Sequence, residues 1–174
     1  GLLVSMGYKM TDDPKDADFV MYNTCAVREH AEQRVFGNVG ALKNIKRRRP
    51  EMLIALCGCM TQQEKIAEKI KKSFPFVDIV IGTHLLHKLP ELIFNRLSGS
   101  KRIISTEGED DIAEGLPILR DGNFKAWVPI MYGCNNFCSY CIVPYVRGRE
   151  RSRKSSDIIN EVKKLVQSGY KEIT

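Results

Sequence analysis

Three cysteines stand close together at Cys134, Cys138 and Cys141, with three residues in the first gap and two in the second. This spacing suits a shared ligand better than disulfides, because nothing in the sequence indicates secretion. A structural zinc site needs four closed ligands, whereas no histidine follows His87 and no cysteine follows Cys141. A ferredoxin-type cluster also takes four cysteines, normally with two residues in each tight gap. Three thiolates therefore favour a 4Fe-4S cluster that leaves one iron without a protein ligand.

Such an open iron can chelate the amino and carboxylate groups of S-adenosylmethionine, and an electron from the cluster can then break a carbon–sulfur bond of the sulfonium. The same spacing, with an aromatic residue just before the last cysteine, resembles the signature of the radical S-adenosylmethionine superfamily. Tyr140 occupies the aromatic position. The resemblance implies that Tyr140 lies near the adenine of the cofactor, and an ordinary packed tyrosine is the alternative.

The elements that must position these cysteines alternate between strands and helices. An apolar run at residues 18–25 precedes a helical pattern at 28–48, and two further strand–helix units follow. This alternation favours the α/β class, here a small doubly wound parallel sheet with helices on its faces. Ligands gather at the carboxyl ends of such strands, where Cys25 and Cys59 fall; buried structural cysteines are the alternative. The other units are expected at 52–57 with 62–73 and at 77–81 with 85–97.

The same pattern divides the chain into three parts. Residues 1–98 are expected to form the first domain, and 99–123, with glycine, proline and an acidic run, a linker. Residues 124–174 predict a strand at 124–131, the cysteine loop and a helix at 156–168, which is the first unit of a radical S-adenosylmethionine (β/α) partial barrel. The chain starts without methionine and stops where a strand begins, so we expect both ends to be cut.

Positive charge is concentrated in the last part of the chain. The net charge is +6, and residues 124–174 carry nine Lys or Arg against four Asp or Glu. This imbalance favours a polyanionic partner such as nucleic acid, although a basic face is often only solvated surface. No apolar run of eighteen residues occurs, so no membrane-spanning helix is expected. Five basic side chains follow the cysteine cluster: Arg147, Arg149, Arg151, Arg153 and Lys154. They are spaced to bind phosphates or the carboxylate of the cofactor, and the alternative is that they pair with carboxylates of the domain. Of the five, Arg149 is assigned to the cofactor.

Two other groups are interpreted as structural. Lys43 and the basic run 46–49 close the predicted helix at 28–48, where cations stabilise a helix carboxyl end. His84 and His87 are three residues apart, but no carboxylate or third histidine stands close by. We interpret both histidines as surface or packing residues rather than as a metal pair.

Several longer stretches extend the resemblance to nearly the whole chain. Residues 23–28, 58–62 and 133–153 resemble the methylthiotransferases of the radical S-adenosylmethionine superfamily. Within that family, 141–153 and 29–37 are most similar to members that add a methylthio group to C2 of N(6)-dimethylallyl-adenosine next to the tRNA anticodon. Related members that act on threonylcarbamoyl-adenosine in tRNA, or on an aspartate of a ribosomal protein, are the alternative.

The resemblance also implies a second metal site. In this family an amino-terminal domain supplies three cysteines to an auxiliary 4Fe-4S cluster. Cys25 and Cys59 would be two of these ligands, and the third is expected upstream of residue 1. Cys57 matches no ligand position of the family, so we interpret it as a core residue of its strand.

The reaction and its partners follow from the same resemblance. One S-adenosylmethionine methylates sulfur associated with the auxiliary cluster, and a second is cleaved at the Cys134/Cys138/Cys141 cluster to methionine and a 5′-deoxyadenosyl radical. The radical removes hydrogen from adenine C2, which has no acidic proton for a base to take, and C2 then captures the methylthio group. The base must be unstacked, as an anticodon loop allows. A flavodoxin-type electron donor, a monomeric state and a cytoplasmic location are expected.

Two functions of other classes fit the cysteines less well. An electron-transfer module would hold clusters whose spectra do not change with S-adenosylmethionine. A zinc-stabilised nucleic-acid-binding protein would be colourless and contain zinc. Neither accounts for a three-ligand site beside a second cysteine-bearing α/β domain, so the enzyme is favoured.

Overall fold

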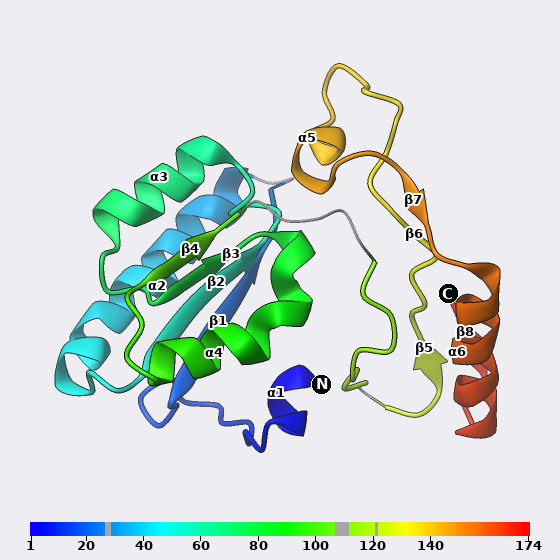
Figure 1. Ribbon diagram of the computed structural model, residues 1–174, viewed down its shortest axis with the longest axis horizontal. Helices are drawn as coiled ribbons and strands as arrows, with labels where there is room; N and C mark the ends of the chain where they lie inside the picture. Colours follow the sequence, from blue (N-terminus) through cyan, green and yellow to red (C-terminus); the bar gives the residue numbers. More distant parts are fainter. Residues whose placement is uncertain (27–28, 107–111, 121) are drawn as a thin grey trace.

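A parallel sheet of four strands forms the larger part of the structure (Figure 1). Its strands are β1 (Phe19–Thr24), β2 (Leu53–Gly58), β3 (Ile79–Ile81) and β4 (Ile103–Ser105). They follow one another in chain order, and β2 is buried from end to end, as expected for a parallel strand covered on both faces. The computed structural model describes residues 1–26, 29–106, 112–120 and 122–174, and at 29–31 it describes the backbone alone.

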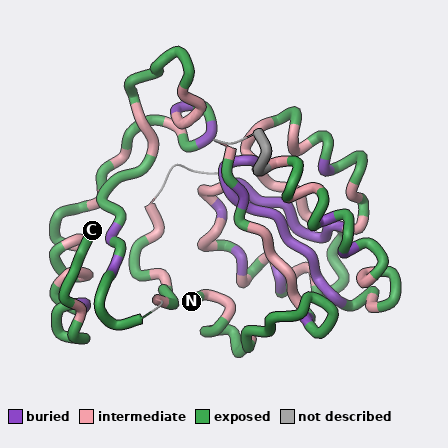
Figure 2. The backbone as a smooth tube through the Cα atoms, turned by 180° about the vertical axis from the view of Figure 1, so that it is seen from behind, coloured by how far each residue is buried: buried purple, intermediate pink, exposed green. Residues whose placement is uncertain are grey.

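Helices cover both faces of this sheet, which confirms the predicted α/β class. They are α1 (Leu2–Ser5), α2 (Glu29–Arg48), α3 (Glu64–Ser73), the 3-10 helix η1 (Thr83–Lys88) and α4 (Leu89–Leu97). Alternate residues of β2 point to opposite faces: Ile54 and Leu56 share a core with α2 and α3, and Leu53 and Ala55 share one with η1 and α4. Figure 2 shows that the buried segments gather in the strands. Within the described residues, no helix is long and apolar enough to span a membrane.

Two predicted elements are divided in the structure. The helix expected at 85–97 consists of η1 and then α4, which has Pro90 in its first turn. Proline interrupts a continuous helix but suits the first turn of a new one. The prediction of a single strand at 124–131 is wrong, because two strands occur here, β5 (Lys125–Ala126) and β6 (Met131–Tyr132), which lie in different sheets. Pro129, between them, has no N–H to donate to a strand ladder.

The interval 99–123 contributes to the first sheet. β4 lies inside this interval and pairs in parallel with β3 over three residues. The sheet therefore extends past the domain boundary predicted at residue 98, and two consecutive isoleucines are the sequence signal for the added strand. Residues 107–111 and 121 of the predicted linker lie outside the described residues.

The second part of the chain, residues 124–174, contains a short α/β unit. Here α6 (Ser155–Gln167) connects to β8 (Glu172–Ile173), which pairs in parallel with β5. The helix expected at 156–168 is confirmed, and its buried Leu165 packs on Ala126 and Val128. A separate antiparallel pair joins β6 to β7 (Arg151–Ser152). This arrangement is consistent with the start of the predicted second α/β domain.

A buried ionic network ties the helices to the first sheet. Asp78, which directly precedes β3, is 3% exposed. Its carboxylate accepts hydrogen bonds from Lys46 of α2 at 2.9 Å, Arg96 of α4 at 2.8 Å and the Ile54 amide of β2 at 2.9 Å. Lys46 also donates to two backbone carbonyls just beyond the end of α2. The structural role expected for Lys46 is confirmed, but its partners are Asp78 and two carbonyls outside α2, so the role of the basic run 46–49 as a helix cap stays a prediction.

We expect Asp78→Ala to lower the free energy of unfolding by about 3–5 kcal/mol, because it leaves the charges of Lys46 and Arg96 without their buried partner. Urea titration followed by circular dichroism measures this loss. The control Asp12→Ala removes a carboxylate from an exposed position and should change the free energy by less than about 0.5 kcal/mol. Equal unfolding midpoints for the two variants would show that the network does not stabilise the fold.

Candidate functional site

Cys25 and Cys59 lie at the same edge of the first sheet. Each directly follows the last residue of a strand, Thr24 of β1 or Gly58 of β2, and these two residues are register partners. The Cys59 amide donates to the Thr24 carbonyl at 3.0 Å, which continues the ladder past the strand ends. The expected placement at the carboxyl ends is confirmed, and the role of both cysteines as ligands stays a prediction. Residues 27–28, which complete the motif after Cys25, lie outside the described residues.

Gly58 allows the two strands to approach closely at this edge. Its φ of +103° lies in the left-handed region that glycine adopts at little cost. A Cβ added at Gly58 would meet the Thr24 carbonyl oxygen at 2.2 Å. Thr24 is itself buried, and its Oγ1 donates to the Cys57 carbonyl at 2.6 Å. The backbone that carries Cys25 and Cys59 is therefore fixed from both strands.

The three cysteines near this edge differ in burial. Cys25 is exposed, whereas Cys59 is 5% and Cys57 2% exposed. Burial, followed by the charge of nearby Cys59, raises the pKa of the Cys57 thiol to about 12. Cys57 is therefore protonated at neutral pH in the metal-free protein. Its burial and its packing in the core support the interpretation of Cys57 as a core residue.

Alkylation should distinguish Cys57 from the other thiols in the metal-free native protein. Iodoacetamide reacts with the thiolate, so at pH 8 we expect label on exposed Cys25 and Cys138 but not on Cys57. The raised pKa of Cys57 also makes the stability of the fold depend on pH. The neutral thiol contributes its full stabilisation below the pKa that it has in the unfolded chain, about 8.5, and this contribution is lost as the pH rises through about 12. Peptide mass spectrometry measures the label, and labelling of Cys57 at the rate of Cys25 at pH 8 would contradict this account.

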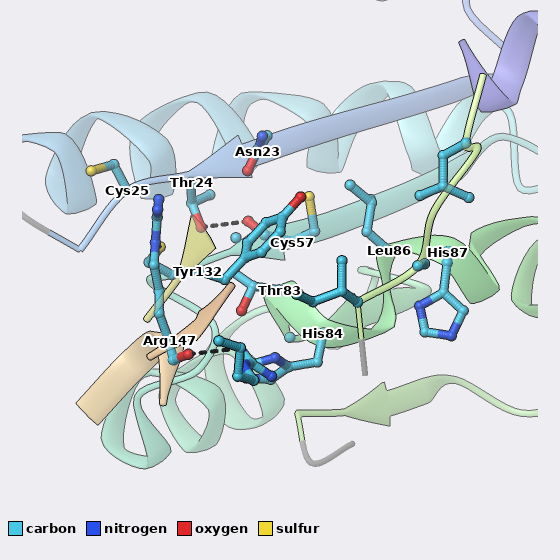
Figure 3. A pocket seen from close by; sticks show the side chains of 17 residues that line it. Asn23, Thr24, Cys25, Cys57, Thr83, His84, Leu86, His87, Tyr132 and Arg147 are labelled. Carbon is cyan, nitrogen blue, oxygen red and sulfur yellow. Dashed lines mark hydrogen bonds between the residues drawn. The ribbon is translucent and has the colours of Figure 1, made fainter. Parts of the chain in front are cut away.

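A cavity of about 490 Å³ lies between the sheet edge and the second part of the chain. Figure 3 shows Cys25 on one side of it, with Tyr132 and Arg147 reaching in from the second part. His84 and His87 of η1 also line this cavity, so the structure places both histidines in its wall. The volume is in the range of small-molecule and cofactor sites.

Arg147 joins the second part of the chain to the sheet edge. It is the last residue of α5 (Val143–Arg147), and its Nε donates to the Cys59 Sγ at 3.1 Å. Arg151 donates to the Arg147 carbonyl at 3.0 Å. The spacing of the arginines predicts that Arg147 binds phosphates or a carboxylate, and it does not indicate this contact with Cys59. Because 88 positions separate the two partners, no local pattern could have indicated it.

Cys134, Cys138 and Cys141 lie in the loop between β6 and α5. The Cys134 amide donates to the Gly148 carbonyl at 3.2 Å, and the Cys141 amide donates to the Cys138 carbonyl at 2.9 Å. Phe137 has a φ of +46°, which is uncommon for a residue other than glycine and marks a tight turn inside the loop. Hydrogen bonds thus hold the loop at its entrance and between its last two cysteines.

The donor set of this loop fits an iron–sulfur cluster in type and number. All three cysteines are free; Cys138 is exposed and the other two are half-buried. Thiolate sulfur is the ligand that such clusters take. Within the described ranges of the chain, no three His, Cys, Asp or Glu side chains are grouped as a metal site. The structure therefore places the three thiols on one loop, and their shared ligand stays a prediction.

The remaining candidate residues differ in what they contact. Tyr140 is 91% exposed and Arg149 is also exposed, so both are accessible to a ligand and their assignment to the cofactor stays a prediction. Arg153 instead pairs with Glu114 at 2.6 Å and with Glu161 at 2.8 Å. Its hydrogen bond with Glu114, and then that with Glu161, raises the pKa of Arg153 above the ordinary arginine value. Pairing with carboxylates of the domain is therefore the role of Arg153.

Comparison with known proteins gives matches along the whole chain. Residues 1–82 match the family described as "Uncharacterized protein family UPF0004", and residues 128–174 match the "Radical SAM superfamily". A curated relative from Clostridium tetani (strain Massachusetts / E88), named tRNA-2-methylthio-N(6)-dimethylallyladenosine synthase, is 56% identical over 100% of this chain and 39% of its own length. Proteins of the same name from Clostridium perfringens (strain SM101 / Type A) and Caldicellulosiruptor saccharolyticus are 55% and 53% identical over 100% of this chain, and 39% and 37% of their own lengths.

The chain spans about two fifths of the length of these relatives. The first matched segment contains the sheet edge with Cys25 and Cys59, and the second contains the loop with Cys134, Cys138 and Cys141. Both cysteine sets that carry the resemblance therefore lie inside matched segments. More than half of the residues of the chain are identical to those of these relatives, so the chain is similar to these synthases over its whole length, in agreement with the predicted resemblance to the radical S-adenosylmethionine methylthiotransferases.

Proposed function

We propose that the whole protein is a tRNA methylthiotransferase that adds a methylthio group to C2 of N(6)-dimethylallyl-adenosine next to the anticodon. One observation carries this proposal: residues that flank the cysteine loop, Tyr132 and Arg147, line the same cavity as Cys25 and Cys59. The cysteine loop is thus flanked on both sides by residues of the cavity that Cys25 and Cys59 also line. The names of the relatives support the same reaction.

Two 4Fe-4S clusters and S-adenosylmethionine are the cofactors of this proposal. Cys134, Cys138 and Cys141 would hold the cluster that leaves an iron for S-adenosylmethionine, and Cys25 and Cys59 would be two ligands of the auxiliary cluster. When bound, these cofactors supply the one-electron chemistry that replaces the C2–H bond of adenine with a C2–S bond.

The chain's own residues would bind and shield the reactants. Tyr140 offers an exposed aromatic face within the cysteine loop for the adenine ring, and Arg149 offers a guanidinium for a carboxylate. Apolar side chains, among them Leu86 and Leu116, form part of the cavity wall. An apolar wall limits the water that reaches a reactive site.

The charge of the second part supports tRNA as the substrate. Residues 124–174 carry nine Lys or Arg against four Asp or Glu, and basic side chains bind a phosphate backbone by releasing its counterions. A flavodoxin-type protein is our proposal for the electron donor, because the cluster chemistry requires single electrons. A monomeric state and a cytoplasmic location complete the proposal.

The test uses the whole protein, reconstituted anaerobically with iron and sulfide and supplied with dithionite, S-adenosylmethionine and tRNA that bears N(6)-dimethylallyl-adenosine. Mass spectrometry of the nucleosides should show the gain of one methylthio group. If 5′-deoxyadenosine forms while this tRNA stays unchanged, the substrate is threonylcarbamoyl-adenosine or a ribosomal-protein aspartate instead. A fully loaded protein that forms neither product would contradict the enzyme. Cluster spectra insensitive to S-adenosylmethionine would then indicate an electron-transfer module, and bound zinc without colour a zinc-binding module.

A further inference from the structure

One hydrogen bond crosses the cavity between the two parts of the chain. The Arg147 Nε stands 3.1 Å from the Cys59 Sγ. Cys59 is 5% exposed, and its own amide is bound to the Thr24 carbonyl, so the sulfur has little freedom to move. A guanidinium donor forms its strongest hydrogen bonds with charged acceptors. The geometry therefore suits a Cys59 sulfur that carries negative charge, as a cluster ligand does.

The composition of the cavity wall points the same way. Arg147 lines this cavity, and none of the described residues that line it is an aspartate or a glutamate. The described wall therefore offers Arg147 no carboxylate to pair with. The positive charge of Arg147 therefore favours a negatively charged group beside it, and a cluster ligated by thiolates has that charge.

Arg147 is also fixed relative to the cysteine loop. Arg147 is the sixth residue after Cys141, and the last five of these six residues form the single helical segment α5. A helix holds its residues at a set rise along its axis, and the Arg147 carbonyl is bound by Arg151 at 3.0 Å. One short helix and one hydrogen bond thus connect the cysteine loop to the edge that carries Cys59.

We propose that Arg147 is a positioning residue that donates a hydrogen bond to the Cys59 sulfur at the auxiliary cluster, and so sets the reduction potential of that cluster and its place relative to the cysteine loop. This inference rests on the proposed function. Hydrogen bonds to ligand sulfurs raise the potential of a cluster, because they stabilise its more negative, reduced state. The predicted effect of removing the donor is therefore a shift to more negative potential.

The test measures the midpoint potential of the auxiliary cluster in the whole protein. Alanine replaces Cys134, Cys138 and Cys141 in this background, so that only the auxiliary cluster contributes to an electron paramagnetic resonance titration. Here Arg147→Gln should shift the midpoint to more negative potential, and Arg147→Lys should shift it less, because lysine keeps the charge but not the planar donor. The matched control Arg47→Gln removes the same charge from the exposed end of α2, at the opposite edge of the sheet, and should leave the midpoint unchanged.

A midpoint of Arg147→Gln equal to that of Arg47→Gln would overturn the proposal. If Arg147→Gln does not fold or hold iron, Arg147→Met keeps the apolar stem and is titrated instead, with the same expected direction and the same overturning result. With all cysteines intact, Arg147→Gln should lower methylthio transfer about 10–100-fold while 5′-deoxyadenosine still forms. A background protein that binds no auxiliary cluster contradicts the proposed function, whereas a bound cluster with a potential independent of Arg147 contradicts this inference alone.

Discussion

Replacing Cys138 with alanine in the whole protein should reduce 5′-deoxyadenosine formation to background and abolish methylthio transfer. The loop supplies three thiolates, and a cluster held by two of them lacks a required ligand. Because Cys138 is exposed, its loss should cost the fold little. The bound iron should fall by about half, since Cys25 and Cys59 belong to the separate auxiliary site of the proposed function. Iron analysis, circular dichroism and chromatography of the nucleosides measure these three quantities.

Cys57→Ala is the matched control, because it also removes one thiol but takes it from the core of the first sheet. We expect this variant to keep both clusters and its activity, and to lose roughly 1–2 kcal/mol of unfolding free energy from the cavity that it leaves. Cleavage of S-adenosylmethionine by Cys138→Ala, or loss of cleavage in a well-folded Cys57→Ala, would contradict the assignment of the ligands.

The sheet edge with Cys25 and Cys59 could be predicted from sequence because it depends on local patterns. Short apolar runs followed by helical periods define the strands and helices. A parallel arrangement then brings the carboxyl ends of the strands to one edge. The register that pairs Thr24 with Gly58 is not predicted in this way, because β2 is buried on both faces and its apolar pattern does not distinguish one register from the next.

The contacts across the cavity could not be predicted in this way. Arg147 and Cys59 are 88 positions apart, and Asp78 binds partners 18 to 32 positions away. Whether such side chains meet depends on how the helices pack on the sheet, which no local pattern encodes. Arg153 shows the same limit, because its spacing fits a phosphate as well as a carboxylate and its partner Glu114 comes from the predicted linker.

Gly58→Ala should destabilise the protein and release iron from the auxiliary site, although it removes no ligand. A φ of +103° strains any residue with a Cβ. The added carbon would also stand 2.2 Å from the Thr24 carbonyl oxygen, which is backbone and cannot rotate away. Relief requires β1 and β2 to separate where they present Cys25 and Cys59. We expect a loss of about 2–4 kcal/mol in unfolding free energy, measured by urea titration, and the loss of auxiliary iron in the whole protein.

Variants at two other glycines are controls that distinguish backbone strain at a positive φ from the steric clash between an added Cβ and β1. Gly99 has a φ of +95° with nothing within 4 Å of an added Cβ, so Gly99→Ala tests strain alone and should cost about 1 kcal/mol. Gly40 lies inside α2 with open space around it, and alanine there should stabilise the protein by about 0.5–1 kcal/mol. Neither variant should lose iron. If Gly58→Ala resembles Gly99→Ala in stability and keeps its iron, then the approach of β1 to β2 does not hold the site; a larger loss together with iron release would show that the backbone of these two strands, and not the cysteines alone, makes the auxiliary site.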